Sequence, residues 1–294
     1  MARKVGNMIT IDAGIWSAWN SYHSYYPDQD VAHARNMYET RVLQAIRDIE
    51  ATRSGQVLLS AIRKPIAIIP VDPATGIMKG TSARPDDGEK ATRKGSPMLE
   101  CDGSGELFSD ARGSGVGSGS TIFFTPGVGF SHEFTFIPTY GPGVQADEVL
   151  FHELVHALRS GHGMLDCGAA RDRYDTVDDF VAILFTNIYS SERNRPLRMN
   201  HRTFSRLPKV RSTSAGYLAA YSVEIEELCT SFPQLTHRLS AVECPFNPIR
   251  EYYSSRIRSM AGAASDDLKQ DQVIVIEIPF ELQFAPPRRR RRGK

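Results

Sequence analysis

The clearest amphipathic pattern of the chain lies at residues 146–160, where apolar positions recur at helical spacing. Leu150, Leu154 and Leu158 follow one another every four residues and form one apolar stripe. Acidic residues open the segment and Arg159 stands near its end, an arrangement that suits the helix dipole. We predict a helix over residues 146–160 that is buried along one side.

The same periodicity predicts further helices at residues 30–53, 57–62, 176–192, 215–230 and 247–262, and Gly55 offers the first of them a stop. Apolar and β-branched runs predict strands at residues 65–71, 121–125, 133–137 and 273–284. Residues 72–120 are rich in Gly, Ser, Asp and Lys, which predicts one long loop. We therefore expect an α+β fold. In it a small mixed or antiparallel sheet packs on the 146–160 helix, and the C-terminal part is rich in helices.

The composition is that of a globular protein. The chain has 294 residues, of which 41% are hydrophobic and 23% charged, so it can bury a sizeable core. No run of 18 apolar residues is present, and we expect no transmembrane helix. The first basic residues precede no apolar segment, so we expect no secretory signal. We expect a helical extension over residues 1–54, a main domain over 55–284 and an Arg-rich tail over 285–294.

The net charge of +1 hides an asymmetry. Residues 286–294 hold six basic groups and no acid, and the remainder has 29 basic against 34 acidic residues. This acidic body argues against nucleic acid as the main partner. The run Arg288–Arg292 predicts a disordered end. Its alternative uses are nuclear entry or attraction of nucleic acid, a membrane-surface tether, and simple solubility.

The four cysteines are far apart and form no CxxC pair; they are Cys101, Cys167, Cys229 and Cys244. Their spacing argues against a structural zinc ribbon and against a dense disulfide framework. Reduced thiols are the simpler expectation, and two long-range disulfides are the alternative.

The segment that carries chemistry is His152-Glu-Leu-Val-His156, an H-E-x-x-H pattern inside the predicted helix. Residues four apart lie one above the other on a helix, so both imidazoles can reach one metal ion. Glu153 would stand beside the metal, where it can take the proton of a water whose pKa zinc has lowered. The pattern predicts a Zn²⁺ site with His152 and His156 as ligands and Glu153 as general base.

A catalytic zinc site needs a third protein ligand, and the sequence leaves several open. Asp178 and Asp179 follow on the next predicted helix, although acidic residues at a helix N-terminus are also favoured by the dipole alone. Glu226 and Glu227 are the reserve candidates.

His162 is another alternative, because it lies six residues after His156, as in the longer pattern H-E-x-x-H-x-x-G-x-x-H. Arg159 occupies the position of the glycine that would turn the chain back toward the metal. We therefore interpret His162 as a surface histidine near a helix end.

Four blocks of the chain resemble secreted bacterial effector zinc peptidases; they are residues 115–126, 147–159, 174–192 and 198–204. Those effectors include the C-terminal metallopeptidase domains of type VI secretion spike proteins and the type III effector peptidases. The resemblance implies a zincin-like metallopeptidase fold and a protein substrate in a target cell. It also implies export from the producing cell's cytoplasm without a signal peptide, with a secretion-system carrier or chaperone as a further partner.

The zincin arrangement that the resemblance implies places the substrate antiparallel to an edge strand. Residues 121–125 and 133–137 are the candidate strands. A donor for the developing oxyanion is also needed. The open candidates for this donor are His201, Tyr221, Tyr189 and Tyr217.

Two other functions stay open at the level of sequence. The chain could grip a host protein without cleaving it, with zinc in a structural or vestigial role. It could also be a zinc hydrolase that acts on a non-protein amide bond, for example in cell-wall material.

Overall fold

The computed structural model describes residues 2–13, 31–70, 81–101, 104–126, 141–171, 174–200 and 204–267. The chain forms two units, Met1–Tyr253 and Ser254–Lys294, and the site described below lies within the first. None of the helices in the described ranges is long and apolar enough to cross a membrane.

A five-stranded sheet forms one layer of the first unit, with the strand order β1-β2-β3-β7-β4. The strands are β1 (Arg3–Val5), β2 (Ile9–Ile11), β3 (Ile66–Ile69), β7 (Ser120–Phe123) and β4 (Ser82–Pro85). The three central strands run parallel, and the outer strands β1 and β4 run antiparallel to their neighbours. A separate hairpin pairs β5 (Pro97–Leu99) with β6 (Leu107–Arg112).

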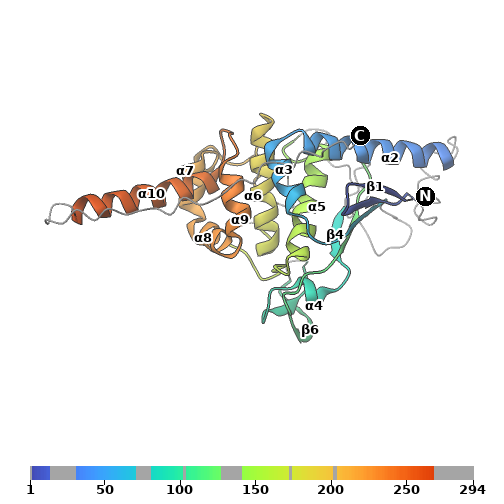
Figure 1. Cartoon of the computed structure of the whole chain (residues 1–294), viewed down its shortest axis with the longest axis horizontal. Helices are drawn as coiled ribbons and strands as arrows, with labels where there is room; N and C mark the ends of the chain where they lie inside the picture. Colours follow the sequence, from blue (N-terminus) through green and yellow to red (C-terminus); the bar gives the residue numbers. More distant parts are fainter. Residues whose placement is uncertain are drawn as a thin grey trace, which may run out of the picture. The chain divides into compact units, whose positions relative to one another are not determined.

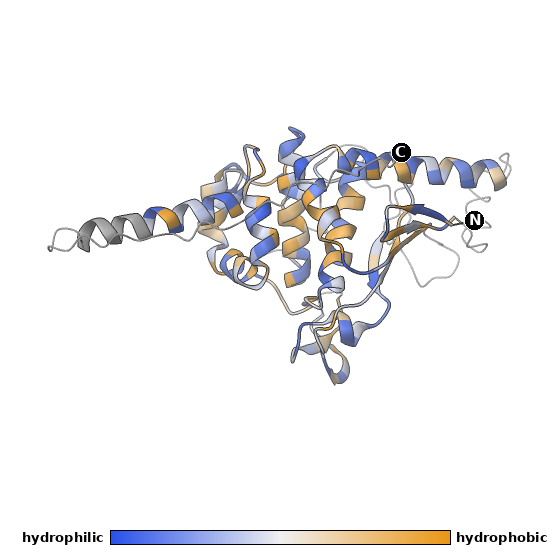
Figure 2. Ribbon diagram, in the orientation of Figure 1, coloured by the Kyte–Doolittle hydropathy of each residue, from blue (hydrophilic) through white to orange (hydrophobic). Residues whose placement is uncertain are grey.

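The helices of the described ranges are α2 (Val31–Glu50), α3 (Arg53–Ala61), α4 (Gly88–Ala91), α5 (Ala146–Gly161), α6 (Val177–Glu192), α7 (Ser214–Ala220), α8 (Ser222–Ser231), α9 (Pro233–Ser240) and α10 (Pro248–Asp267), with a 3₁₀ turn at Lys209–Arg211. Helix α5 lies between the sheet and α6 and contacts both (Figure 1). Much of the sheet, α5 and α6 is hydrophobic (Figure 2), and residues of all three are buried in one core. The fold is thus α+β, as expected.

Helices α5 and α6 form an antiparallel pair that is tied at both ends. The first turn of α5 meets the last turns of α6, where Tyr189 donates to Asp147 over 2.5 Å and Ser190 donates to Glu148 over 2.6 Å. The rings of Phe151 and Tyr189 stack with centroids 4.5 Å apart. The predicted stripe of Leu150, Leu154 and Leu158 is fully buried in the same core. This packing fixes which residues of the two helices face one another.

Both central helices agree with the sequence prediction to within a residue or two, but the prediction for residues 30–53 was wrong in detail. The chain breaks into α2 and α3 at Thr52, which caps α3 by accepting a hydrogen bond from the Gly55 amide over 3.0 Å. Gly55 is inside α3 and is not a stop. A Cβ at this position would lie 1.8 Å from the Ile49 carbonyl oxygen, so only glycine permits this close approach.

The prediction of one long loop over residues 72–120 was also wrong. In its described part this segment contains β4, α4, β5 and β6. Short elements such as these are stabilised by partners distant in sequence, which local composition does not reveal. The predicted strands at 65–71 and 121–125 correspond to β3 and β7, whereas residues 133–137, 273–284 and 285–294 lie outside the described residues.

The N-terminal segment predicted as a helical extension contributes strands as well as a helix. Ile9 and Ile11 of β2 and Val42, Ile46 and Ile49 of α2 are buried in the same core as α5. The described part of residues 1–54 therefore packs with the site-bearing layers.

The expectation of reduced cysteines fails at one pair. Cys101 and Cys167 form a disulfide, while Cys229 and Cys244 are free thiols. The two bonded cysteines are 66 residues apart, and sequence spacing alone does not identify such a pair.

The N-terminus of α3 is capped by a carboxylate from the end of α6. Glu192 accepts hydrogen bonds from the Arg53 and Ser54 amides and from the Ser54 hydroxyl, at 2.6, 3.0 and 2.6 Å. We predict that Glu192→Gln lowers the free energy of unfolding by ~1–2 kcal/mol, because a neutral amide satisfies these donors less well. Urea unfolding with Glu227→Gln, an exposed change on α8, as the control measures the effect. Equal midpoints for both variants would contradict it.

Candidate metal centre

The two histidines of the H-E-x-x-H pattern lie on one face of α5, as their spacing predicts. Their Nε2 atoms are 3.1 Å apart, and the rings meet edge to face with centroids separated by 4.7 Å. His152 is 2% exposed and Glu153 5% exposed, so both lie within the protein. Two imidazole nitrogens at this separation can ligate one ion.

A third ligand atom comes from the first turn of α6. The Asp179 Oδ1 atom lies 3.7 Å from His156 Nε2, and the three ligand atoms all lie within 4.8 Å of one another. Ligands bound to tetrahedral zinc at 2.0–2.1 Å are separated by about 3.3 Å. His152, His156 and Asp179 could therefore hold one metal ion with a modest adjustment of their side chains. We call these three residues the metal triad.

Asp179 has two tasks, one for each carboxylate oxygen. Its Oδ2 atom accepts hydrogen bonds from the Thr176 amide at 3.1 Å and from the Thr176 hydroxyl at 2.8 Å. The Thr176 hydroxyl in turn accepts from the Asp179 amide at 3.0 Å, which completes a capping box at the start of α6. The cap holds the carboxylate with Oδ1 toward His156, so helix capping and metal binding are compatible in one residue.

Asp178 lies outside the metal triad and holds His156 from behind. Its Oδ2 atom is 2.5 Å from His156 Nδ1, and its Oδ1 atom accepts a hydrogen bond from Arg159 Nε. Arg159 also donates to the Met164 carbonyl over 2.7 Å. A carboxylate on Nδ1 fixes the tautomer and the ring orientation that present Nε2 to a metal. Of the two aspartates proposed as ligands, the geometry thus gives Asp179 the ligand position and Asp178 the supporting one.

The charges around His156 stabilise its protonated form when no metal is bound. Burial by itself lowers the pKa of His156, but the hydrogen bond and charge of Asp178, with Glu153 and Asp179, raise it to about 9. Burial by itself raises the pKa of Asp178. The charge of Arg159 and the hydrogen bond and charge of His156 outweigh burial and hold the pKa of Asp178 below its ordinary value. A metal ion that binds Nε2 must therefore displace a proton.

The sequence analysis did not identify Arg198 as a site residue. Arg198 is 5% exposed, and its charge interacts with the charges of Glu153 and Asp179. Burial lowers the pKa of Arg198 to about 10, although the charges of Glu153 and Asp179 act in the opposite direction. Asn187 holds its backbone through two hydrogen bonds of 2.7 Å. The guanidinium carbon of Arg198 lies 4.1 Å from the centroid of the Phe204 ring. The only sequence signal for this residue was its place in the block 198–204.

The reserve ligand candidates lie elsewhere. His162 caps the end of α5, where its Nε2 contacts the Ala61 carbonyl oxygen at 2.8 Å and its ring packs on Phe232. Glu226 and Glu227 are exposed on α8, and neither belongs to the metal triad.

The candidate oxyanion donors have other partners. The Tyr221 hydroxyl accepts a hydrogen bond from Arg211 at 2.7 Å, Tyr217 pairs with Tyr174 through their hydroxyls, and Tyr189 donates to Asp147. His201 lies outside the described residues, and its role stays a prediction.

The expectation that residues 121–125 form an edge strand was wrong. Strand β7 lies between β3 and β4, so within the described residues β4 is the outer strand on this side of the sheet. Residues 133–137, the alternative, lie outside the described range.

The raised pKa of His156 predicts how the stability of the metal-free chain depends on pH. The pKa of His156 in the folded chain, about 9, exceeds its ordinary value of 6.5. The stabilisation that protonated His156 contributes is therefore complete below pH 6.5 and is lost as the pH rises through 9. We expect the urea midpoint to fall between about pH 6 and about pH 9.5, and His156→Asn to remove most of that dependence. An unchanged pH dependence in the variant would contradict the assignment.

Comparison with known proteins gives a family match. Residues 29–201 match the family model Peptidase_M91, described as effector protein, over more than half of the chain. No curated protein and no solved structure matches the chain. The matched range includes α2, the sheet strands β3, β4 and β7, the metal triad and Arg198. The chain therefore belongs to the Peptidase_M91 family of effector proteins.

Proposed function

We propose that this effector is a zinc-dependent endopeptidase that cleaves a protein of the target cell after secretion. Membership of a peptidase family supports hydrolysis of a protein substrate. The observation that carries the zinc assignment is the convergence of His152 Nε2, His156 Nε2 and Asp179 Oδ1 beside the buried Glu153. Two imidazoles and one carboxylate are a donor set of catalytic zinc, and three protein ligands leave a position for water or substrate.

Zinc bound at the triad would lower the pKa of a water molecule and polarise the scissile carbonyl. Glu153 then acts as general base and takes a proton from the attacking water. The same carboxyl group delivers that proton to the leaving amine. The positive charge of Arg198 interacts with the charge of Glu153, so a buried cation acts on the proposed base.

The sheet offers the substrate an outer strand that contacts α5. Strand β4 pairs with β7 on one side and contacts α5, the helix that carries both histidines. A peptide added beside β4 would place its backbone along α5 through main-chain hydrogen bonds. We therefore assign substrate binding to β4 in place of β7.

We predict that Glu153→Gln lowers peptide cleavage by a factor of ~10²–10⁴. The amide is nearly isosteric but cannot take a proton, so zinc content and the thermal unfolding temperature should match the wild type. The assay follows cleavage of a mixed peptide library by mass spectrometry, with Glu227→Gln as the control.

Retained cleavage by Glu153→Gln would contradict the mechanism. If Glu153→Gln loses cleavage but keeps its effect on target cells, the effector acts by binding a protein without cleaving it. Cleavage of peptidoglycan in place of the peptide library would assign a non-protein amide bond as the substrate.

The two aspartates should differ in their effect on zinc content. We expect about one zinc per wild-type chain, and a chelator should remove both the zinc and the activity. Asp179→Ala should lose most of its zinc because one ligand is missing. Asp178→Asn should retain zinc with an affinity ~10–100-fold weaker, since Asp178 supports His156 and is not itself a ligand. Elemental analysis and zinc titration measure both. Full zinc content in Asp179→Ala, or its loss in Asp178→Asn alone, would reverse the assignment.

A further inference from the structure

The N-terminus of α6 is held by the loop that precedes it. The Val177 amide donates to the Gly168 carbonyl over 2.9 Å, and the Asp178 amide donates to the Asp166 carbonyl over 3.0 Å. The first amides of a helix have no partner inside it, so these two acceptors set where α6 begins. Cys167 is the residue between the two acceptors.

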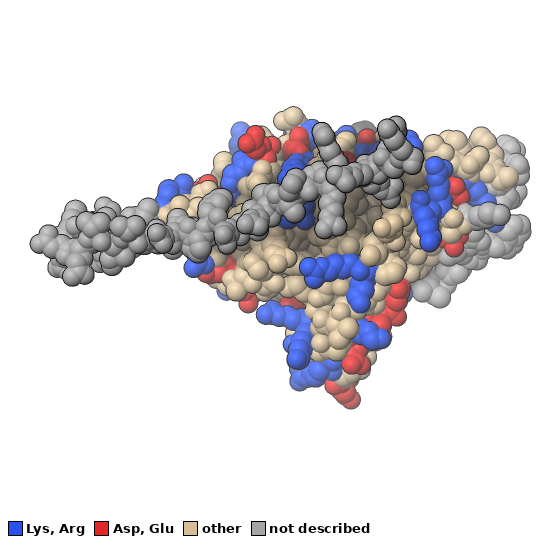
Figure 3. Space-filling model, in the orientation of Figure 1, with Lys and Arg blue, Asp and Glu red and all other residues tan. Residues whose placement is uncertain are grey.

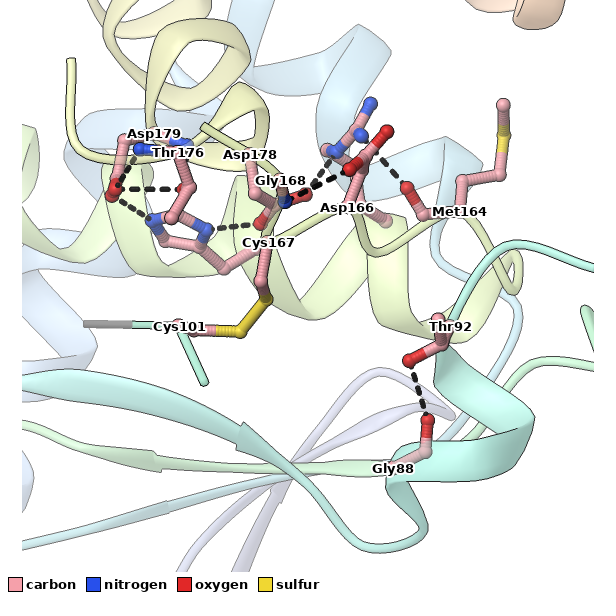
Figure 4. The surroundings of a disulfide bond; sticks show 12 residues. Gly88, Thr92, Cys101, Met164, Asp166, Cys167, Gly168, Thr176, Asp178 and Asp179 are labelled. Carbon is pink, nitrogen blue, oxygen red and sulfur yellow. Dashed lines mark hydrogen bonds and ion pairs between the residues drawn. A yellow bond between two sulfur atoms is a disulfide. The ribbon is translucent and has the colours of Figure 1, made fainter. Parts of the chain in front are cut away.

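The Cys167 sulfur ties this loop to a different part of the chain. Its disulfide partner Cys101 lies two residues after the end of β5, and the β5–β6 pairing continues with the Glu100 amide donating to the Glu106 carbonyl over 2.9 Å. Figure 4 shows the bond next to the start of α6, close to Thr176, Asp178 and Asp179. The hairpin and α4 extend from the body (Figure 1), and acidic and basic side chains are mixed on the face of this region seen in Figure 3.

Non-covalent contacts also join the loop to the end of α4 and to β5. Leu165 and Cys167 form a small apolar cluster with Ala91 and Leu99, separate from the main core. Two backbone hydrogen bonds join Leu165 to the residues on either side of Thr92, at 3.0 and 3.1 Å. The apolar cluster is small, so the covalent bond adds a restraint on the position of this loop to that of the hydrogen bonds.

The two aspartates of the site lie within the first turn that this loop anchors. Asp179 supplies the third ligand atom, and Asp178 supports His156. Outer contacts of this kind change metal affinity because they decide whether the ligand atoms already lie at coordination distance.

We propose that the Cys101–Cys167 disulfide is a positioning clamp for the metal triad, which makes metal affinity depend on the oxidation state of these cysteines. This inference rests on the proposed function, since it concerns the same triad. A dithiol reductant breaks the S–S bond by supplying two electrons and two protons, which yields two cysteine thiols and the disulfide of the reductant. The freed loop then holds the carbonyls of Asp166 and Gly168 less firmly, and the first turn of α6, which Asp178 still ties to α5, becomes more mobile.

The test titrates zinc into the metal-free full chain in competition with a chromophoric chelator. One sample is oxidised; the other is reduced with a dithiol that is removed under anaerobic conditions before the titration. We expect reduction to weaken zinc binding ~10-fold or more. The double variant Cys101→Ser, Cys167→Ser should bind as weakly as the reduced wild type in both samples. The double variant Cys229→Ser, Cys244→Ser should respond to reduction like the wild type.

Two further measurements separate positioning from general destabilisation. Glu192→Gln, which weakens a distant cap, should keep the zinc affinity of the wild type. Amide hydrogen exchange of the metal-free chain should increase on reduction at Val177 and Asp178, while α2 and the central turns of α5 stay protected.

The failures of the two proposals can be told apart. Absence of tight zinc binding in the oxidised wild type would overturn the proposed function and the clamp with it. Equal zinc affinity in the oxidised and reduced chains would overturn the clamp alone. Exchange that increases across the whole chain on reduction would also overturn it, because the bond would then hold the fold and not the site.

Discussion

One buried carboxylate joins the two helices on which the site depends. Asp178 is 2% exposed and contacts His156 of α5 on one side and Arg159 of α5 on the other, although it belongs to α6. A buried charge is costly unless it is paired and hydrogen-bonded, so this residue fixes the start of α6 against the end of α5. The antiparallel packing of the pair then decides which side chains can meet a metal.

The residues around the triad serve the fold and the site together. Asp179 caps α6 with one oxygen and faces His156 with the other, and Arg159 stabilises Asp178 while it holds the Met164 carbonyl. The other end of the helix pair is closed by Asp147 and Glu148 with residues of α6. Because both ends are fixed, the side chains of the metal triad are held near one another, which lowers the ordering cost of binding an ion.

Local periodicity was enough to predict the helices that carry the site. The bounds of α5 and α6 and the shared face of His152 and His156 follow from spacing within a single segment. The choice between Asp178 and Asp179 did not, because adjacent residues at a helix start differ only in the direction of their side chains, which tertiary packing decides. Other features depend on partners far away in sequence, and no local pattern encodes them. They are the strands and α4 within residues 72–120, the Cys101–Cys167 bond and the charge interactions of Arg198 with Glu153 and Asp179.

The central claim is that one zinc ion binds where α5 and the start of α6 meet. Anomalous diffraction at the zinc absorption edge, from crystals of the zinc-loaded chain, tests it directly. The account predicts one strong peak within about 2.0–2.2 Å of His152 Nε2, His156 Nε2 and an oxygen of Asp179. A peak bound by Asp178 in place of Asp179, or no peak near the two histidines, would contradict it.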